Sequence, residues 1–199
     1  MELTDVIFQG PPVDDVELFP LLPSKLRTLL EQVNGFIQFG GGLHVRGACR
    51  DPEWHSLRRA WMGKEAFHQF YRTITETDVP FGQDFLGNQF LLRGDHVIKL
   101  LGETGEIEEL GLPLLDFIEA AQADPAAVLN LEALLLFQEQ GGSLDPGELL
   151  QAEPPFCTQE ADGGVGLTPV SVDEQLAYLR QFHGRIKSVS EDGKINFMS

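Results

Sequence analysis

Four glutamates gather in one short stretch of the chain, Glu103, Glu106, Glu108 and Glu109. Carboxylates that lie near one another without a cation raise each other's pKa, and general acid–base chemistry uses such raised pKa values. The spacing of these four does not place them around a pocket, however. The alternative that we favour is an acidic, solvated sheet edge, which protects a sheet from pairing with another chain.

Other residues that can do chemistry are present without the spacing that chemistry requires. The five histidines show no HxxxH or HExxH pattern, and Cys49 and Cys157 form no CxxC pair. There is no GxSxG nucleophile motif. Residues 40–42 are all glycine, but Leu43 follows them rather than the Lys-Ser/Thr of a phosphate-binding loop. The sequence therefore predicts no catalytic residue, no cofactor and no metal, and hence a protein that is not an enzyme.

The chain is strongly acidic, with 31 Asp and Glu against 14 Lys and Arg and a formal net charge of −17. A field of this sign repels nucleic acid and anionic membranes and attracts basic proteins, although solubility alone is an alternative explanation. Six of the bases lie between Arg46 and Arg72. This clustering predicts either a basic face or internal pairing of these bases with acids.

The N-terminal residues are acidic and lack the basic and apolar regions of a secretory leader. The longest apolar run, residues 134–137, is far too short to span a bilayer. We therefore expect a cytoplasmic protein.

The elements that must position the glutamates can be predicted from periodicity and turn residues. Leu26, Leu29, Leu30 and Val33 form one apolar stripe and predict a helix over residues 23–34. Strand signals surround short glycine-containing turns, and they predict strands at residues 36–39, 43–45, 88–92, 96–101 and 106–108. Helical patterns predict helices over residues 112–123 and 124–139 and a final helix capped by Asp173.

The remaining segments give weaker signals. We expect a loosely ordered start over residues 1–19, a helix beginning at Asp51-Pro52 and a short helix over residues 66–73. Residues 145–150 suggest one helical turn, and residues 165–170 and 194–197 suggest strands. Because strands cluster in the middle and do not alternate regularly with helices, the sequence predicts one α+β domain with a central, mostly antiparallel sheet flanked by helices.

Residues 81–90, with the sequence FGQDFLGNQF, are the most distinctive stretch. We interpret them as a turn between two strands, in which Asp84 accepts backbone N–H groups and Gly87 adopts a positive φ. Asp95 belongs to a second tight turn, Gly94-Asp95, that joins the next two strands. For both aspartates we favour this structural role over contact with a partner.

This stretch resembles the signature of the SUKH superfamily, which includes the fungal Smi/Knr-type cell-wall assembly regulators and many bacterial immunity proteins. Four further segments are similar to that family in type and order: the helix ending in Asn34-Gly35, the strand at residues 97–100, residues 103–106 and the helix at residues 114–120. The resemblance covers about residues 20–130 and leaves about residues 141–199 as a C-terminal extension. It implies an α+β fold without a shared catalytic site, in proteins that bind toxins or act as regulatory scaffolds.

We hypothesise an immunity-type protein that neutralises a polymorphic toxin, such as a nuclease, by direct binding. An acidic surface would dock on a basic toxin domain and block its substrate. The candidate contacts are Asp84, Asp95, Glu103, Glu106, Glu108 and Glu109. A regulatory scaffold that binds an endogenous partner is one alternative, and an uncharacterised hydrolase is another. The sequence leaves the oligomeric state open.

Overall fold

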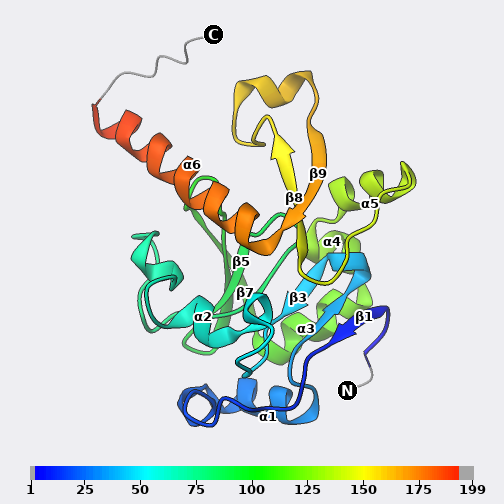
Figure 1. The fold of residues 1–199 in the computed structure, drawn as a ribbon, viewed down its shortest axis with the longest axis vertical. Helices are drawn as coiled ribbons and strands as arrows, with labels where there is room; N and C mark the ends of the chain where they lie inside the picture. Colours follow the sequence, from blue (N-terminus) through cyan, green and yellow to red (C-terminus); the bar gives the residue numbers. More distant parts are fainter. Residues whose placement is uncertain (1–2, 193–199) are drawn as a thin grey trace.

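Seven strands form one antiparallel sheet in which each strand pairs with its neighbours in sequence. The structure is a computed structural model that describes residues 3–192, with side chains through residue 186. The strands of the sheet are β1 Val6–Gln9, β2 Phe36–Gln38, β3 Leu43–Val45, β4 Val79–Gln83, β5 Gln89–Arg93, β6 His96–Leu100 and β7 Ile107–Pro113. The predicted α+β class with a mostly antiparallel sheet is therefore confirmed, and Figure 1 shows the helices packed around the sheet.

Helices cover both faces of this sheet, as the alternating side chains of its strands require. They are α1 Ser24–Gln32, α2 Leu57–Trp61, α3 Leu114–Ala123, α4 Pro125–Leu129, α5 Glu132–Glu139 and α6 Val172–Asp192. The described residues also form short 3-10 helices: η1 Phe19–Leu21, η2 Phe39–Gly41, η3 Glu53–His55, η4 Phe67–Gln69 and η5 Gln159–Gly163.

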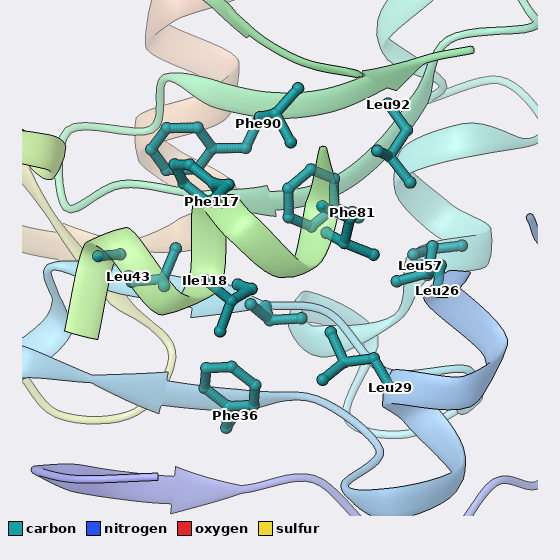
Figure 2. Packing of buried hydrophobic residues seen from close by; sticks show 14 of the residues in the cluster. Leu26, Leu29, Phe36, Leu43, Leu57, Phe81, Phe90, Leu92, Phe117 and Ile118 are labelled. Carbon is teal, nitrogen blue, oxygen red and sulfur yellow. The ribbon is translucent and has the colours of Figure 1, made fainter. Parts of the chain in front are cut away.

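Two buried apolar clusters lie on the two faces of the sheet. On β5, Phe90 and Leu92 belong to the larger cluster, whereas Leu91 between them belongs to the smaller one. The larger cluster joins the sheet to α1 and α3, and Figure 2 shows Phe81, Phe90 and Phe117 in contact within it. The smaller cluster joins strands β5 and β6 to the segment around η4 and to α6. Its main members are Leu91, Ile98, Leu100, Phe67, Tyr71 and the partly buried Leu176.

The C-terminal third adds a second, two-stranded sheet and the long helix α6. Strands β8 Glu148–Glu153 and β9 Gly166–Ser171 pair antiparallel. In Figure 1 they project beyond the main sheet beside the N-terminal end of α6. Leu150 N donates to Phe85 O at 2.7 Å, which joins β8 to the turn after β4. Strand β8 of the predicted extension thus packs on the core expected at about residues 20–130.

Two glycines allow α6 to approach the main sheet closely. A Cβ at Gly87 would lie 2.9 Å from a methyl carbon of Leu179, and a Cβ at Gly102 would lie 2.8 Å from the same atom. Gly87 also has a φ of +88°, so the predicted positive φ at this position is confirmed. Larger residues at these two positions would push α6 away from the turns that follow β4 and β6.

Several predicted elements differ from the structure. The described part of the predicted loose start, residues 3–19, contains a strand, because β1 pairs with β2. The predicted helix after Asp51-Pro52 is split into η3 and α2, and residues 66–73 contain only the 3-10 turn η4. The predicted helix over residues 124–139 breaks at Asn130, which adopts a left-handed φ of 55° between α4 and α5.

Strands were underestimated in two further places. Residues 148–153 form β8 rather than the helical turn expected at residues 145–150, since β9 supplies a complete set of backbone partners. Residues 79–83 form β4, so the distinctive stretch begins inside a strand and the turn proper is shorter than expected. The strand predicted at residues 194–197 lies outside the described residues.

A chain of buried polar side chains crosses the second face of the sheet. Because the Asn34 carbonyl can only accept, Nε2 of His55 donates to it at 3.1 Å. Nδ1 of the neutral His55 then accepts from Nε2 of His44 at 2.8 Å, and Nδ1 of His44 accepts from Gln83 at 3.2 Å. Both imidazoles are thus held neutral and in fixed tautomers.

Burial makes protonation of these two histidines unfavourable in the folded protein. It lowers the pKa of His55 to about 4 and lowers the pKa of His44 well below its usual value. Both pKa values lie below the ~6.5 of an unfolded histidine, so between about pH 6.5 and 4 the unfolded chain binds more protons than the folded one. Stability contributed by the neutral pair is therefore full above pH 6.5 and is lost as pH falls.

We predict that the free energy of unfolding decreases below pH 6.5 with a slope approaching about 2.7 kcal/mol per pH unit, the value for two protons. Urea unfolding at pH 7.5, 6.0 and 5.0 measures this slope. A free energy of unfolding that stays constant from pH 6.5 to 5 would contradict this account of the pair.

Candidate functional site

Asp84 is buried and its carboxylate is occupied inside the protein. Its side chain accepts from the backbone N–H groups of Leu86 and Asn88, each at 3.0 Å, and from the Asn88 amide at 2.8 Å. Nζ of Lys99, on β6, lies 3.0 Å from Oδ2 of the same carboxylate. With only 1% of its surface exposed, Asp84 fixes the β4–β5 turn and does not reach a partner. Asp84 thus has the turn-forming role that the sequence favoured.

The other predicted acids separate into two places. Asp95 is exposed in the β5–β6 turn. Glu108 and Glu109 are exposed on β7, where they point to opposite faces because consecutive strand residues alternate. β7 is the last strand of the sheet, so the expected acidic edge is present. Glu103 and Glu106, from the turn before β7, line a groove instead.

This groove has a volume of about 590 Å³ and lies between the β4–β5 and β6–β7 turns, α5, β8 and the start of α6. Its apolar lining includes Phe85, Leu101, Leu136 and Phe156. Leu136 is 53% exposed and Phe156 is 42% exposed, which is unusual for side chains of this size. We refer to this feature, with the sixteen residues that line it, as the acidic groove.

The charged residues that line the acidic groove all have the same sign. Glu103, Glu106 and Glu132 are among its lining residues, and the described lining contains no lysine or arginine. Glu103 also accepts from the backbone N–H groups of Phe156 and Cys157, at 3.1 and 2.9 Å. It therefore holds the β8–β9 connection against the groove and fixes the exposed ring of Phe156 there.

One buried acceptor in the lining has no donor. The amide nitrogen of Gln175, on α6, donates to Leu86 O at 2.8 Å. The amide oxygen of the same side chain is buried and has no hydrogen-bond partner in the described part of the chain. A buried acceptor without a donor is costly, so a donor brought by a bound molecule would be favourable here.

The lining of the groove includes one thiol, that of Cys157. Burial and the neighbouring Glu103 raise the pKa of the Cys157 thiol to about 12, which opposes formation of a nucleophilic thiolate. At four acids that do not line the groove, Asp15, Glu65, Asp78 and Glu174, hydrogen bonds and ion pairs lower the pKa, whereas a general acid needs a raised value. In the described residues there is no cluster of side chains that could hold a metal ion.

Two of the bases between Arg46 and Arg72 are paired with acids inside the protein. Arg58 binds Asp15 with two hydrogen bonds, and Arg59 binds both Glu65 and Asp173. For Arg58 and Arg59, the structure therefore shows the internal pairing of bases with acids that the sequence left open as an alternative. Arg46 is different, because it is buried and has only neutral hydrogen-bond acceptors.

Comparison with models of known protein families, with curated proteins and with solved structures finds no match for this chain. The similarity to the SUKH superfamily thus stays a prediction from the sequence. No helix within residues 3–192 is long and apolar enough to cross a membrane.

The sequence predicted two acids of the acidic groove but missed its apolar residues. A signal for them was present in residues 134–137, Leu-Leu-Leu-Phe, because four consecutive apolar residues on a helix cannot all face one core. Leu134 is buried, and its neighbours Leu135 and Leu136 are the exposed ones. The side chain of Gln175 gave no such signal, since its role depends on the docking of α6.

The two aspartates give a matched test of these assignments. Replacing Asp84 by Asn leaves the ammonium of Lys99 buried beside a neutral amide, and we expect a loss of roughly 3 kcal/mol in the free energy of unfolding. Replacing the exposed Asp95 by Asn should change it by less than about 0.5 kcal/mol. Urea unfolding of both variants makes the comparison, and equal effects would show that the Asp84–Lys99 pair is not structural.

Proposed function

We propose that this protein is a non-catalytic binding module of the immunity type, which neutralises a basic toxin domain by direct binding. The observation that carries the proposal is the acidic groove, an apolar surface with only carboxylates as its charged lining residues. Its chemical complement is a protein segment that presents an apolar side chain flanked by lysine or arginine. The unpaired oxygen of Gln175 adds a position where such a segment can donate a hydrogen bond.

The dimensions of the groove suit part of a protein interface. A few well-packed side chains provide most of the binding energy in protein complexes, and they sit in pockets that exclude water. A groove of about 590 Å³ with exposed Leu136 and Phe156 can receive one or two such side chains. The remainder of the interface would extend over the surrounding acidic surface.

The charge outside the groove supports fast association with a basic partner. Glu108 and Glu109 add to the acidic surface along β7, and the whole chain has a net charge of −17. Complementary fields speed encounter and favour partners of the opposite sign. A nuclease needs a basic surface for phosphate, so an acidic protein that covers this surface blocks substrate by occlusion.

Two neighbouring leucines on α5 allow a controlled test of the groove. Leu136 lines it and is 53% exposed, whereas Leu135 is 44% exposed and does not line it. The tagged protein is used to capture partners from its own cell lysate, and the affinity of the captured protein is then measured. We expect Leu136→Asp to weaken binding by about tenfold or more and Leu135→Asp to leave it unchanged.

The same experiment distinguishes an immunity protein from a regulatory scaffold. For an immunity protein, the captured partner is basic, arrests growth when expressed alone, and is neutralised by co-expression of the wild-type protein but not of Leu136→Asp. A captured partner that is harmless alone would favour the scaffold. Equal binding by both leucine variants would contradict the groove as the binding site.

Reversal of charge along the sheet edge tests electrostatic steering separately. Changing the two edge residues Glu108 and Glu109 together to Lys should slow association with the basic partner and weaken its dependence on salt. Stopped-flow association rates are measured from about 20 to about 300 mM NaCl, a range over which the screening length changes several-fold. Rates and salt dependence equal to those of the wild type would exclude a role for this acidic edge.

A further inference from the structure

Strand β8 presents a free edge, and two backbone hydrogen bonds show which of its residues face that edge. Val172 N donates to Gly147 O at 2.9 Å, on the side of β9, whereas Leu150 N donates to Phe85 O at 2.7 Å, on the side away from β9. The backbone groups of consecutive strand residues alternate in direction, and the register of residues 148–153 with β9 has no bulge. The N–H and C=O of Ala152 therefore point away from β9.

The residues opposite on β9 agree with this alternation. Pro169 pairs with Leu150 and has no N–H, which is compatible with a pair whose two residues exchange no hydrogen bonds. Leu167 pairs with Ala152, so its own N–H points away from β8 on the opposite edge of the two-stranded sheet. Leu167 is not among the residues that line the acidic groove, and it is therefore the internal reference for a test at Ala152.

The outward-facing backbone groups of Ala152 are buried and unpaired. Ala152 is 4% exposed, and in residues 3–192 neither its N–H nor its C=O has a hydrogen-bond partner. The great majority of buried backbone groups in proteins are paired. Because Ala152 lines the acidic groove, a molecule bound there can supply both a donor and an acceptor.

The unpaired part of this edge is one residue long. Toward the start of β8, the outward N–H of Leu150 is already bound by Phe85 O of the β4–β5 turn. Toward the end of β8, the next residue in the alternation is Pro154, which has no N–H. A chain that pairs with β8 from the groove must therefore do so at Ala152.

We propose that the basic segment bound in the acidic groove is an extended strand that pairs antiparallel with β8 at Ala152. This inference rests on the proposed function, which supplies the basic partner. One residue of the segment would exchange both backbone hydrogen bonds with Ala152. A helix bonds its own backbone groups and would leave those of Ala152 unpaired, so an extended segment fits this edge and a helix does not.

The lining of the groove selects the side chains of this strand. Consecutive side chains point to opposite faces of a strand, so lysines that alternate with apolar residues present one charged and one apolar face. Glu106 and Glu132 are charge partners for the lysines, and the exposed Leu136 and Phe156 are contacts for the apolar residues. A second copy of this chain would instead bring a net charge of −17 to the same carboxylates.

Model peptides and NMR of the full ¹⁵N-labelled chain test the pairing without the natural partner. The first peptide is acetylated and amidated Lys-Val-Lys-Val-Lys-Val-Lys, which favours an extended conformation. The second carries N-methyl groups on its three valines, and the third carries them on its last three lysines. Because the N–H groups of a strand alternate in direction, each methylated peptide lacks the N–H groups of one edge only.

We expect the first peptide to move the amide signal of Ala152 downfield and to slow its exchange with solvent, while the amide signal of Leu167 stays unchanged. One methylated peptide should bind about fivefold more weakly than the first, because it cannot donate to the Ala152 carbonyl. The other should bind with nearly the affinity of the first. Such a difference between two peptides of equal charge and composition arises from strand pairing and not from electrostatic attraction alone.

Four results would overturn the inference. An Ala152 amide signal that the first peptide does not move would show that β8 accepts no strand, and equal affinities of the two methylated peptides would show binding without pairing. Tighter binding by a lysine–leucine peptide of helical spacing would assign the groove to a helix. A shift of the Ala152 signal with protein concentration alone would assign the edge to a second copy of the chain.

Failure of this inference can be told apart from failure of the proposed function. If a basic toxin is captured and its binding depends on Leu136, but the methylated peptides bind equally, the strand pairing is wrong and the immunity function stands. If the peptides pair with Ala152 and no basic toxin is captured, the strand-binding edge stands and the immunity function is wrong.

Discussion

Burial of strongly polar groups on one face of the sheet is the constraint that organises this molecule. Four N–H groups of Arg46 are satisfied by β4 and β5, through two backbone carbonyls and through Gln83 and Gln89. The Gln83 amide then continues the chain of hydrogen bonds to His44 and His55. Because a buried polar group without a partner is costly, each of these side chains fixes the next one. Strands β3, β4 and β5 are held in one register by side chains as well as by their backbones.

The same face determines where the C-terminal third packs. Arg180 stacks on Phe67 and Phe70 beside Arg46, while Leu179 on the same helix fits against Gly87 and Gly102. With α6 in this position, Gln175 reaches Leu86 O and the β8–β9 connection comes within reach of Glu103. The acidic groove thus exists because α6 and β8 pack beside the turns of the main sheet. Its binding properties follow from the docking of the extension and not from the predicted core alone.

Local sequence signals predicted most of the fold. The stripe through Leu26, Leu29 and Leu30 and the glycine turns at residues 40–42 and 94–95 each specify a local geometry, and α1 and two hairpins are present where expected. The elements that failed depend on distant partners. β1 is a strand because it pairs with β2, about thirty residues away, and β8 because it pairs with β9. Propensity in a single segment does not contain that information.

The candidate site was predicted only in part, because its geometry also depends on residues that are distant in the sequence. Composition identified the acids, and turn chemistry correctly gave Asp84 a structural role. Sequence spacing could not show that Glu103 and Glu106 face a groove while Glu108 and Glu109 lie along the sheet edge. It also could not show that Arg46 would be buried against neutral hydrogen-bond acceptors, while the neighbouring Arg58 and Arg59 are paired with acids. These properties arise when residues from distant segments converge.

The central claim is that the acidic groove is the surface that binds a basic protein. Hydrogen–deuterium exchange of the protein alone and in complex with its captured partner tests this claim most directly. We expect slower exchange in residues 101–106, 132–136 and 156–157, which contribute to the groove, and unchanged exchange in α1 on the opposite side of the core. Protection confined to α1 or to other surfaces away from the groove would contradict the account.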